Sequence, residues 1–183
     1  MKPSKRLERF AGILVWRPSH AHIHGHRPQQ PPGAARRPEV IRRFLRLPAK
    51  ERALILRLVL LVAAIRLALW TVSFARVQRL LRRPFVASAV PSGLVAGLPV
   101  DRLEWAVRAA SRRVPDATCL TQSLALQFLL ARSGRASALR IGVARRGVRG
   151  FQAHAWVECE GHTLLDRSED VAEYTLLASW EST

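Results

Sequence analysis

The chain is poor in cysteine, and this scarcity narrows the class of protein to which it belongs. Only two cysteines, Cys119 and Cys159, occur in 183 residues. Two thiols are too few for the disulfide framework of a small secreted protein, although the two could pair with each other. The count suits a reducing compartment, in which a thiol nucleophile stays usable. We therefore expect a cytoplasmic protein.

Acidic residues are also scarce, with 13 Asp and Glu against 30 Lys and Arg, and the net charge of +17 is unevenly spread. Basic and acidic side chains number 8 and 2 in residues 1–39 (+6), 15 and 3 in 40–113 (+12), and 7 and 8 in 114–183 (−1). The basic middle indicates an acidic partner (peptide, protein, nucleic acid or membrane surface) or the Arg-rich background of a GC-rich genome. No aromatic-rich basic motif is present, so we expect no nucleic acid partner.

Long uncharged apolar runs are missing as well. The most apolar helical pattern is interrupted by Arg57 and Arg66, which leave only residues 58–65 uncharged between them. A helix that crosses a bilayer needs about 20 apolar residues, so we expect no membrane span. The apolar stretch 10–16 is too short for the hydrophobic region of a secretory signal.

Residues 1–39 differ in composition from the rest of the chain. Their prolines exclude a long helix or a central strand, so we expect a disordered extension. An alternative is that the compact protein starts near Val40 and the extension is not translated. Histidines alternate in this segment, and imidazole is a common transition-metal ligand. No Cys or carboxylate completes a site within the run, and we assign no metal to it; the four residues are His20, His22, His24 and His26.

From residue 47 onward the pattern is helical. Pro48 suits a first helical position, and Glu51 lies in the first turn. Other faces of this helix are also apolar, which predicts a helix that is buried or meets a partner. Further helices are expected over 74–83 and 101–113, with a loop over 84–98. The main stripe of the first helix comprises Leu54, Leu58, Leu61, Ile65 and Leu69.

Residues 114–183 combine one helix with strands. A helix is expected from Cys119 to near Gly134, with Asp116 or Thr118 as its cap. The period then changes to two, which predicts strands over 138–144, 150–160 and 162–167, the last two joined tightly at Gly161. The final residues give no clear period, and the best prediction for them is a short helix over 171–180. The expected class is α+β.

Three residues in this region have the chemistry of a thiol-based acyl-transfer site. Cys119 opens the helix, where unpaired N–H groups and the helix dipole favour a thiolate. His154 lies in the strand at 150–160, and Asp166 lies across the hairpin, within reach of the imidazole. A thiolate attacks a carbonyl, the imidazole carries protons and the carboxylate orients the imidazole. The competing interpretation of Cys119 is a small buried hydrophobe.

Strand alternation separates the neighbours of His154 into two groups. Cys159 falls on the face that packs against the core, so we expect it to be structural. Gln152 and Trp156 share the face of His154, and we predict that they contact substrate; the alternative for Trp156 is that it only packs. His162 lies at the hairpin turn and is expected to be solvated.

Three segments and one residue resemble a known family. They are residues 119–130 (CLTQSLALQFLL), 139–143 (LRIGV) and 151–158 (FQAHAWVE), followed by Asp166. The combination is similar to that of the transglutaminase-like proteins of lasso-peptide biosynthesis, the leader peptidases that mature a ribosomally made precursor. The resemblance covers residues 40–170.

The resemblance implies a papain/transglutaminase-like fold, with N-terminal helices packed on a small antiparallel sheet. It implies Cys119 as nucleophile, His154 as base and acid, and Asp166 as the orienting carboxylate, with no metal or organic cofactor. It also implies three partners: the precursor (leader) peptide, a separate small leader-recognition protein, and an asparagine-synthetase-like lasso cyclase that closes the macrolactam ring.

Together these observations predict three regions: an extension (1–39), a basic helical region (40–113) that we expect to dock partners, and a catalytic core (114–183). The expected function is that of a cysteine peptidase that removes the leader and frees the core N-terminus. Another acyl transfer on the same thiol, such as amide cross-linking, remains an alternative. So does a non-catalytic basic adaptor that binds peptide, membrane or nucleic acid.

Overall fold

The structure is a computed structural model that describes residues 48–83, 86, 88–145 and 150–182. The chain divides into two compact units, Met1–Arg52 and Ala53–Thr183. The second unit contains the elements described below, apart from the first turn of the first helix. The expectations for residues 1–39, namely disorder, an untranslated start and the alternating histidines, lie outside the described residues.

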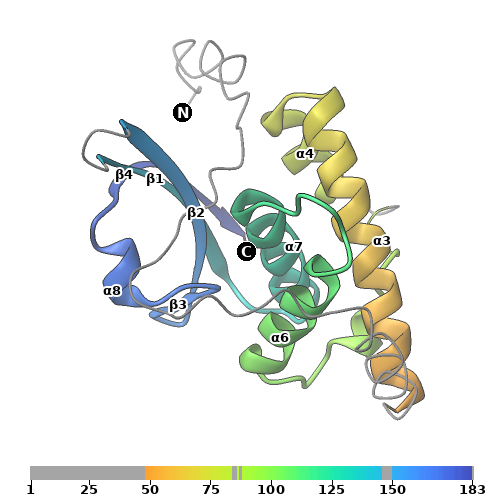
Figure 1. The fold of residues 1–183 in the computed structure, drawn as a ribbon. Helices are drawn as coiled ribbons and strands as arrows, with labels where there is room; N and C mark the ends of the chain where they lie inside the picture. Colours follow the sequence, from red (N-terminus) through yellow and green to blue (C-terminus); the bar gives the residue numbers. More distant parts are fainter. Residues whose placement is uncertain (1–47, 84–85, 87, 146–149, 183) are drawn as a thin grey trace, which may run out of the picture. The chain divides into compact units, whose positions relative to one another are not determined.

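A four-stranded antiparallel sheet forms one layer of the second unit (Figure 1). It consists of β1 (Ser137–Arg145), β2 (Phe151–Cys159), β3 (His162–Leu164) and β4 (Thr175–Ser182), in the order β3-β2-β1-β4. The register places His154 of β2 opposite Gly142 of β1. The hairpin β2–β3 turns at Gly161, whose φ of 79° is in the left-handed region that glycine adopts without strain.

Helix α7 (Cys119–Arg132) packs on this sheet. Thr118 caps it by accepting a hydrogen bond from the Thr121 N–H (3.3 Å), as one of the two predicted caps. Two polar side chains fasten the helix to strands: Ser123 Oγ donates to the carbonyl of Ala155 (3.0 Å), and Gln127 Nε2 donates to that of Trp180 (2.8 Å). The N-terminus of α7 is thereby fixed against β2.

Further helices lie on the side of α7 away from the sheet, with α7 and α6 between the sheet and α3 in Figure 1. Their bounds agree with the predicted positions to within a few residues. They are α3 (Ala49–Thr71), α4 (Phe74–Leu81) and α6 (Val100–Ser111). The 3-10 turn η2 (Ser92–Leu94) lies within the predicted loop, and the short α8 (Ser168–Val171) lies beside the sheet (Figure 1).

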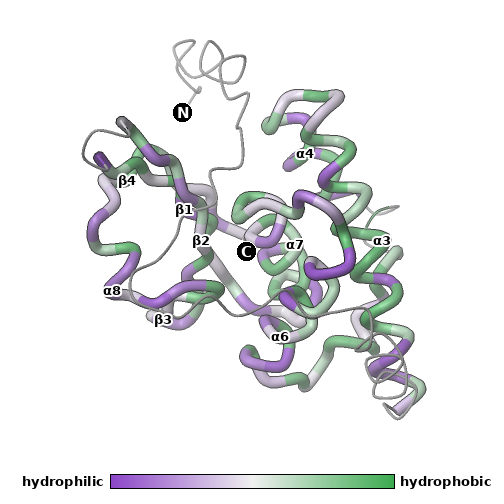
Figure 2. Tube along the Cα trace, viewed as in Figure 1, coloured by the Kyte–Doolittle hydropathy of each residue, from purple (hydrophilic) through white to green (hydrophobic). Residues whose placement is uncertain are grey.

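Helix α3 is apolar along most of its length (Figure 2). Four residues of the predicted stripe, Leu54, Leu58, Leu61 and Ile65, are buried in the core shared with α6 and α7. By length and composition alone α3 is able to cross a membrane, because its most apolar stretch of 18 residues has a mean hydropathy of 2.3. A third of that stretch, however, is buried within the protein. Core helices of soluble proteins pass the same test.

The predicted fold class, α+β with helices on a small antiparallel sheet, is confirmed. The predicted final helix over 171–180 is wrong, because most of that segment is β4 and only α8 is helical nearby. Strand β4 is an edge strand whose partly buried positions, Ala178 and Trp180, alternate with exposed ones. Its conformation comes from pairing with β1, a tertiary contact that overrides weak local preference.

Candidate active site

Cys119 is the first residue of α7 and lines a cavity of about 190 Å³. Its position places the thiol beside the free N–H groups of the first helical turn, which favour negative charge. The thiol is partly exposed, so a substrate can reach it. The cavity is lined by Cys119, Gln122, His154, Ala155, Leu165 and Asp166.

His154 and Asp166 are joined by a short hydrogen bond. His154 Nε2 and Asp166 Oδ2 lie 2.7 Å apart, and both side chains are largely shielded from solvent (18% and 28% exposed). The two residues belong to one hairpin, since Asp166 follows β3 by two residues. With Nε2 held by the carboxylate, Nδ1 is the nitrogen left for the thiol.

The charges around His154 stabilise its protonated form. Burial alone lowers the pKa of the imidazole, but hydrogen bonds to Asp166 and Cys119 and the negative charges of both raise it from 6.5 to about 9. At neutral pH the imidazole is therefore a cation between a carboxylate and a sulfur. This is the charge state in which it can give a proton to a leaving group.

Aromatic rings support the imidazole from the side. The Trp156 ring stacks on His154 with centroids 6.2 Å apart and 16° between planes, and the Tyr174 ring lies 5.2 Å from it. Gly142 makes room for both, because a Cβ there would lie 2.9 Å from Tyr174 Cβ and 3.0 Å from the Trp156 ring. A glycine is thus required by space at this position.

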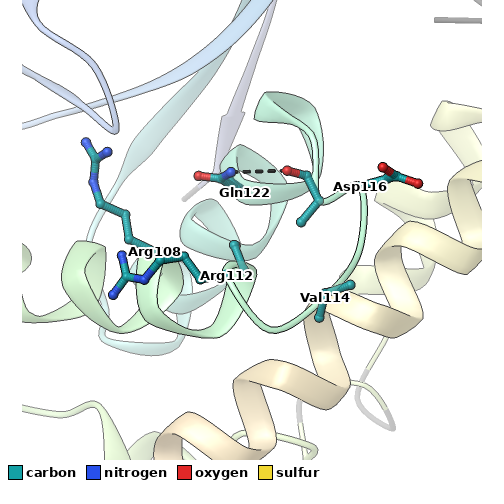
Figure 3. A pocket seen from close by; sticks show the side chains of 7 residues that line it. Arg108, Arg112, Val114, Asp116 and Gln122 are labelled. Atoms are coloured by element: carbon teal, nitrogen blue, oxygen red, sulfur yellow. Dashed lines mark hydrogen bonds between the residues drawn. The ribbon is translucent and has the colours of Figure 1, made fainter. Parts of the chain in front are cut away.

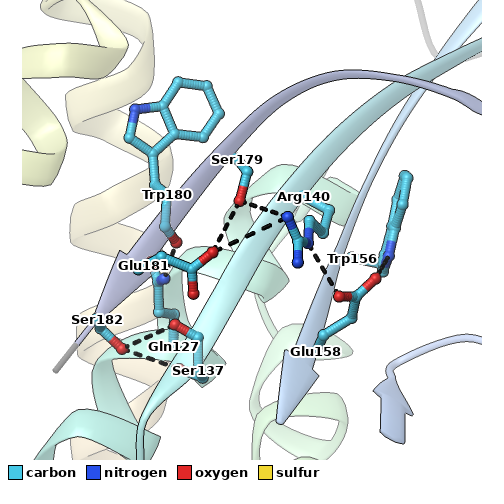
Figure 4. Close-up of polar contacts among 9 residues, drawn as sticks. All are labelled: Gln127, Ser137, Arg140, Trp156, Glu158, Ser179, Trp180, Glu181 and Ser182. Atoms are coloured by element: carbon cyan, nitrogen blue, oxygen red, sulfur yellow. Dashed lines mark hydrogen bonds and ion pairs between the residues drawn. The ribbon is translucent and has the colours of Figure 1, made fainter. Parts of the chain in front are cut away.

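Trp156 is held in turn by a polar network on the outer face of the sheet (Figure 4). Its Nε1 donates to Glu158 (3.1 Å), which also accepts from Arg140 Nε (2.9 Å). Nη1 of Arg140 in turn donates a hydrogen bond to Ser179 Oγ of β4 (2.7 Å). The network therefore connects three strands to the ring that stacks on His154.

The turn that carries Asp166 has a strained backbone, and a hydrogen bond to α6 holds it in place. Leu165 has φ of 70°, a left-handed conformation that is costly for a leucine. Its N–H donates to Glu104 Oε1 of α6 (3.1 Å), and the same oxygen accepts from Arg108 Nη2 (2.7 Å). Helix α6 thus stabilises the backbone conformation that directs Asp166 toward His154.

A larger cavity of about 480 Å³ lies next to the first and shares Gln122 with it (Figure 3). Gln122 is oriented by donating to the carbonyl of Ala117 (3.2 Å). The side chains of Arg108 in α6 and of Arg112 just after it extend on one side of this cavity. Its lining comprises Arg108, Ser111, Arg112, Val114, Asp116, Ala117 and Gln122.

The structure brings the three predicted residues, Cys119, His154 and Asp166, to one cavity, while their catalytic roles stay predictions. Trp156 is buried (4% exposed) and Gln152 is exposed. Neither lines the cavity at Cys119, and their predicted contact with substrate stays a prediction.

Two other predictions concern residues away from the cavity. Cys159 is buried in the core, where burial raises its thiol pKa, and His162 is exposed at the hairpin turn. Within residues 48–83, 86, 88–145 and 150–182, no cluster of three or more His, Cys, Asp or Glu side chains is placed to hold a metal.

Three supporting residues escaped the sequence analysis, namely Tyr174, Leu165 and Glu104, whereas Gly142 lies in a segment that carries the resemblance but was given no role. Only Glu104 carried a local signal, since it forms an i,i+4 pair with Arg108. That pair predicts helix stabilisation and gives no hint of the link to Leu165, which is 61 residues away.

The fold and the site together define a class. A thiol at the start of a helix that packs on an antiparallel sheet, facing an imidazole–carboxylate pair on one hairpin, is the arrangement expected for transglutaminase-like proteins. The chain belongs to the transglutaminase-like superfamily, whose sequence profile matches residues 58–179. No curated protein and no solved structure gave a significant match. Membership suggests a thiol-dependent peptidase or acyltransferase; the superfamily generally includes cysteine peptidases with a Cys-His-Asp triad.

Proposed function

We propose that this protein is a cysteine peptidase that removes the leader from a ribosomally made lasso-peptide precursor. The observation that carries the peptidase chemistry is the connected set of Cys119, His154 and Asp166, in which the pKa of His154 is about 9. The assignment to lasso peptides is supported by the resemblance of residues 139–143 and 151–158 to that family.

The proposed reaction follows from the positions of these groups. The Cys119 sulfur attacks the carbonyl carbon at the leader–core junction and forms a tetrahedral intermediate. His154 donates its proton to the leaving amine, which becomes the core N-terminus, and the leader stays bound as a thioester. Water then attacks the thioester while His154 takes up a proton from it, which releases the leader acid and restores the Cys119 sulfur beside a protonated His154. Asp166 holds the imidazole throughout.

The supporting residues fit this proposal. In the segments that carry the resemblance, Gly142 leaves space for Trp156, Trp156 stacks on His154, and Glu158 holds Trp156. Each of these residues therefore contributes to the position of the imidazole. An acyl-transfer site needs its groups held to within a fraction of an ångström.

The partners and location belong to the same proposal. The substrate is the precursor peptide, presented by a separate small leader-recognition protein, and the freed core passes to an asparagine-synthetase-like cyclase. The reaction takes place in the cytoplasm and its steps require no metal or organic cofactor. Transfer to an amine instead of water, as in amide cross-linking, would use the same thiol and imidazole.

Mass spectrometry of the precursor, incubated with its recognition protein and this enzyme, tests the proposal. We expect cleavage of one peptide bond by the wild type and by Cys159→Ala, and none by Cys119→Ala. Cys159→Ala is the matched control, because it removes the other thiol, which lies in the core. Cleavage by Cys119→Ala would contradict the assigned nucleophile. A mass increase through a new amide would favour cross-linking, and binding without any change in mass would favour the adaptor alternative.

A further inference from the structure

Helix α3 carries a second apolar stripe that faces solvent. We call it the outer stripe; its side chains are 57%, 71%, 60% and 66% exposed, and it consists of Leu56, Leu60, Leu67 and Trp70. Including Leu80 of α4, five of the nine large exposed hydrophobic side chains in the described part of the chain lie within residues 53–83. Single exposed leucines need no explanation, whereas a continuous stripe of them marks an interaction surface.

The outer stripe lies opposite the buried one. At about 100° per residue its four members fall within an arc of about 80°, on the far side of the helix from Leu58 and Ile65. The stripe extends about 21 Å along the helix, from Leu56 to Trp70. The core already uses the inner side of α3, so the outer stripe is not needed to close the core.

The segment that carries this stripe is basic and has no acidic residue within its own sequence. Residues 53–83 contain six arginines and no Asp or Glu. Arg57 and Arg66 flank the stripe on its two sides, and the Arg66 guanidinium lies over the Trp70 ring, 4.6 Å from its centroid. The other four are exposed on or just after α4: Arg76, Arg79, Arg82 and Arg83.

The combination of apolar and basic groups discriminates between the possible binding partners of the outer stripe. A second copy of the chain would bring two basic surfaces together, which charge repulsion disfavours. A nucleic acid would attract the arginines but would not take up leucine side chains. An acidic protein, the sequence-based expectation for this region, would normally form about one hydrogen bond per 100–200 Å² of interface. The outer stripe offers only the indole N–H of Trp70 for such bonds.

A membrane surface with anionic lipids matches both parts of the pattern. Leucines enter the region between headgroups and acyl chains, tryptophan is favoured at that depth, and arginines contact lipid phosphates. We propose that α3 and α4 dock the protein on an anionic lipid surface, with the outer stripe of α3 lying in the membrane plane. The helix does not cross the bilayer in this arrangement, because its inner stripe stays in the core.

Co-sedimentation of the full chain with vesicles tests this inference. We expect the wild type to partition onto vesicles of phosphatidylglycerol and phosphatidylcholine, and much less onto phosphatidylcholine alone. Placing a negative charge on two exposed leucines of the outer stripe, in Leu60→Glu/Leu67→Glu, should weaken partitioning at least about tenfold. The matched control, Leu176→Glu/Leu177→Glu, changes two leucines of β4 that are 49% and 59% exposed and should partition like the wild type.

The charged part of the surface has its own test. Arg76→Gln and Arg79→Gln should each weaken partitioning by about fivefold at low salt, with the effect shrinking as salt is added. Arg112→Gln, an exposed arginine of the loop after α6, is the control. Cys119→Ala should partition like the wild type, which keeps this test independent of the proposed peptidase activity. Far-UV circular dichroism verifies that each variant is folded.

Several outcomes would overturn the inference. One is that the wild type does not partition onto anionic vesicles. Another is that the Leu60→Glu/Leu67→Glu variant is folded and partitions onto these vesicles as well as the wild type does. Tighter binding to single-stranded RNA or to an acidic polypeptide, with the vesicles left unbound, would also count against a lipid surface. So would a concentration-dependent dimer that the double variant abolishes.

Discussion

Helices α3 and α7 are both rich in leucine, yet they are buried to very different extents. Nine of the 14 residues of α7 are buried, including the polar Ser123 and Gln127, which hydrogen-bond to strands. Only six of the 23 residues of α3 are buried, all on its inner side. Helix α7 has neighbours on two sides, the sheet and α6, whereas α3 has the core on one side. An apolar composition alone therefore does not tell how many faces of a helix are covered.

The difference also separates two tasks. Burial on two sides gives α7 a fixed position, and the proposed nucleophile is its first residue. Partial burial leaves α3 anchored by one stripe and free to present the other. The following predictions test this separation.

The largest effect is expected when the site at the end of α7 is broken without touching α3. Asp166→Asn keeps the shape of the side chain and removes its charge, so the pKa of His154 should fall from about 9. Peptidase activity should fall roughly 10²- to 10⁴-fold. Vesicle partitioning should not change, since α3 is intact; a parallel loss would indicate a folding defect.

The same variant has a pH signature. The folded pKa of His154 lies above the 6.5 of an unfolded histidine. Its protonation therefore stabilises the fold fully below pH 6.5, and this contribution is lost as pH rises through about 9. Activity of the wild type should disappear over the same upper range, and the limit should move to lower pH in Asp166→Asn. Activity profiles and urea unfolding between pH 6 and 10 measure both; an unchanged limit would contradict the role of Asp166.

A matched pair of leucines sharpens the comparison of the helices themselves. Leu126→Ala opens a cavity at a fully buried position of α7 and should lower the free energy of unfolding by about 2–5 kcal/mol. Leu60→Ala in the outer stripe should change it by no more than about 0.5 kcal/mol. Urea denaturation monitored by circular dichroism gives both values. Similar losses in the two variants would mean that the outer stripe is covered within the chain.

A smaller effect should come from α6, which supports the site from a distance. Glu104→Ala removes the acceptor of the Leu165 N–H, which should destabilise the fold by about 1–3 kcal/mol and let Asp166 move. We expect about a tenfold lower kcat with little change in KM, because Glu104 lines neither of the two cavities described near Cys119. Glu104→Gln keeps an oxygen acceptor and should restore most of the activity. Equal kcat in the wild type and in Glu104→Ala would exclude the positioning role.

Local patterns were enough to predict much of the fold and the three-residue constellation. The stripe and cap of α7 are helical signals, and the approach of His154 to Asp166 follows from one tight hairpin at Gly161. The missing parts depend on contacts between distant segments. Strand β4 gains its conformation from β1, Tyr174 reaches His154 from beyond the hairpin, and Glu104 reaches Leu165 across 61 residues. Periodicity showed that α3 is apolar on several faces but not which face stays exposed.

The spacing of the three site residues along the chain has a consequence for the order of folding. His154 and Asp166 are 12 residues apart within a hairpin, whereas Cys119 is 35 residues before His154 and on another element. Contacts close in sequence form sooner than distant ones, because less chain entropy is lost in closing the loop. During folding the imidazole–carboxylate pair can thus assemble first, and the thiol meets it only when α7 docks on the sheet. In the proposed mechanism, a chain in which α7 has not yet docked would therefore carry Cys119 without the imidazole that activates it.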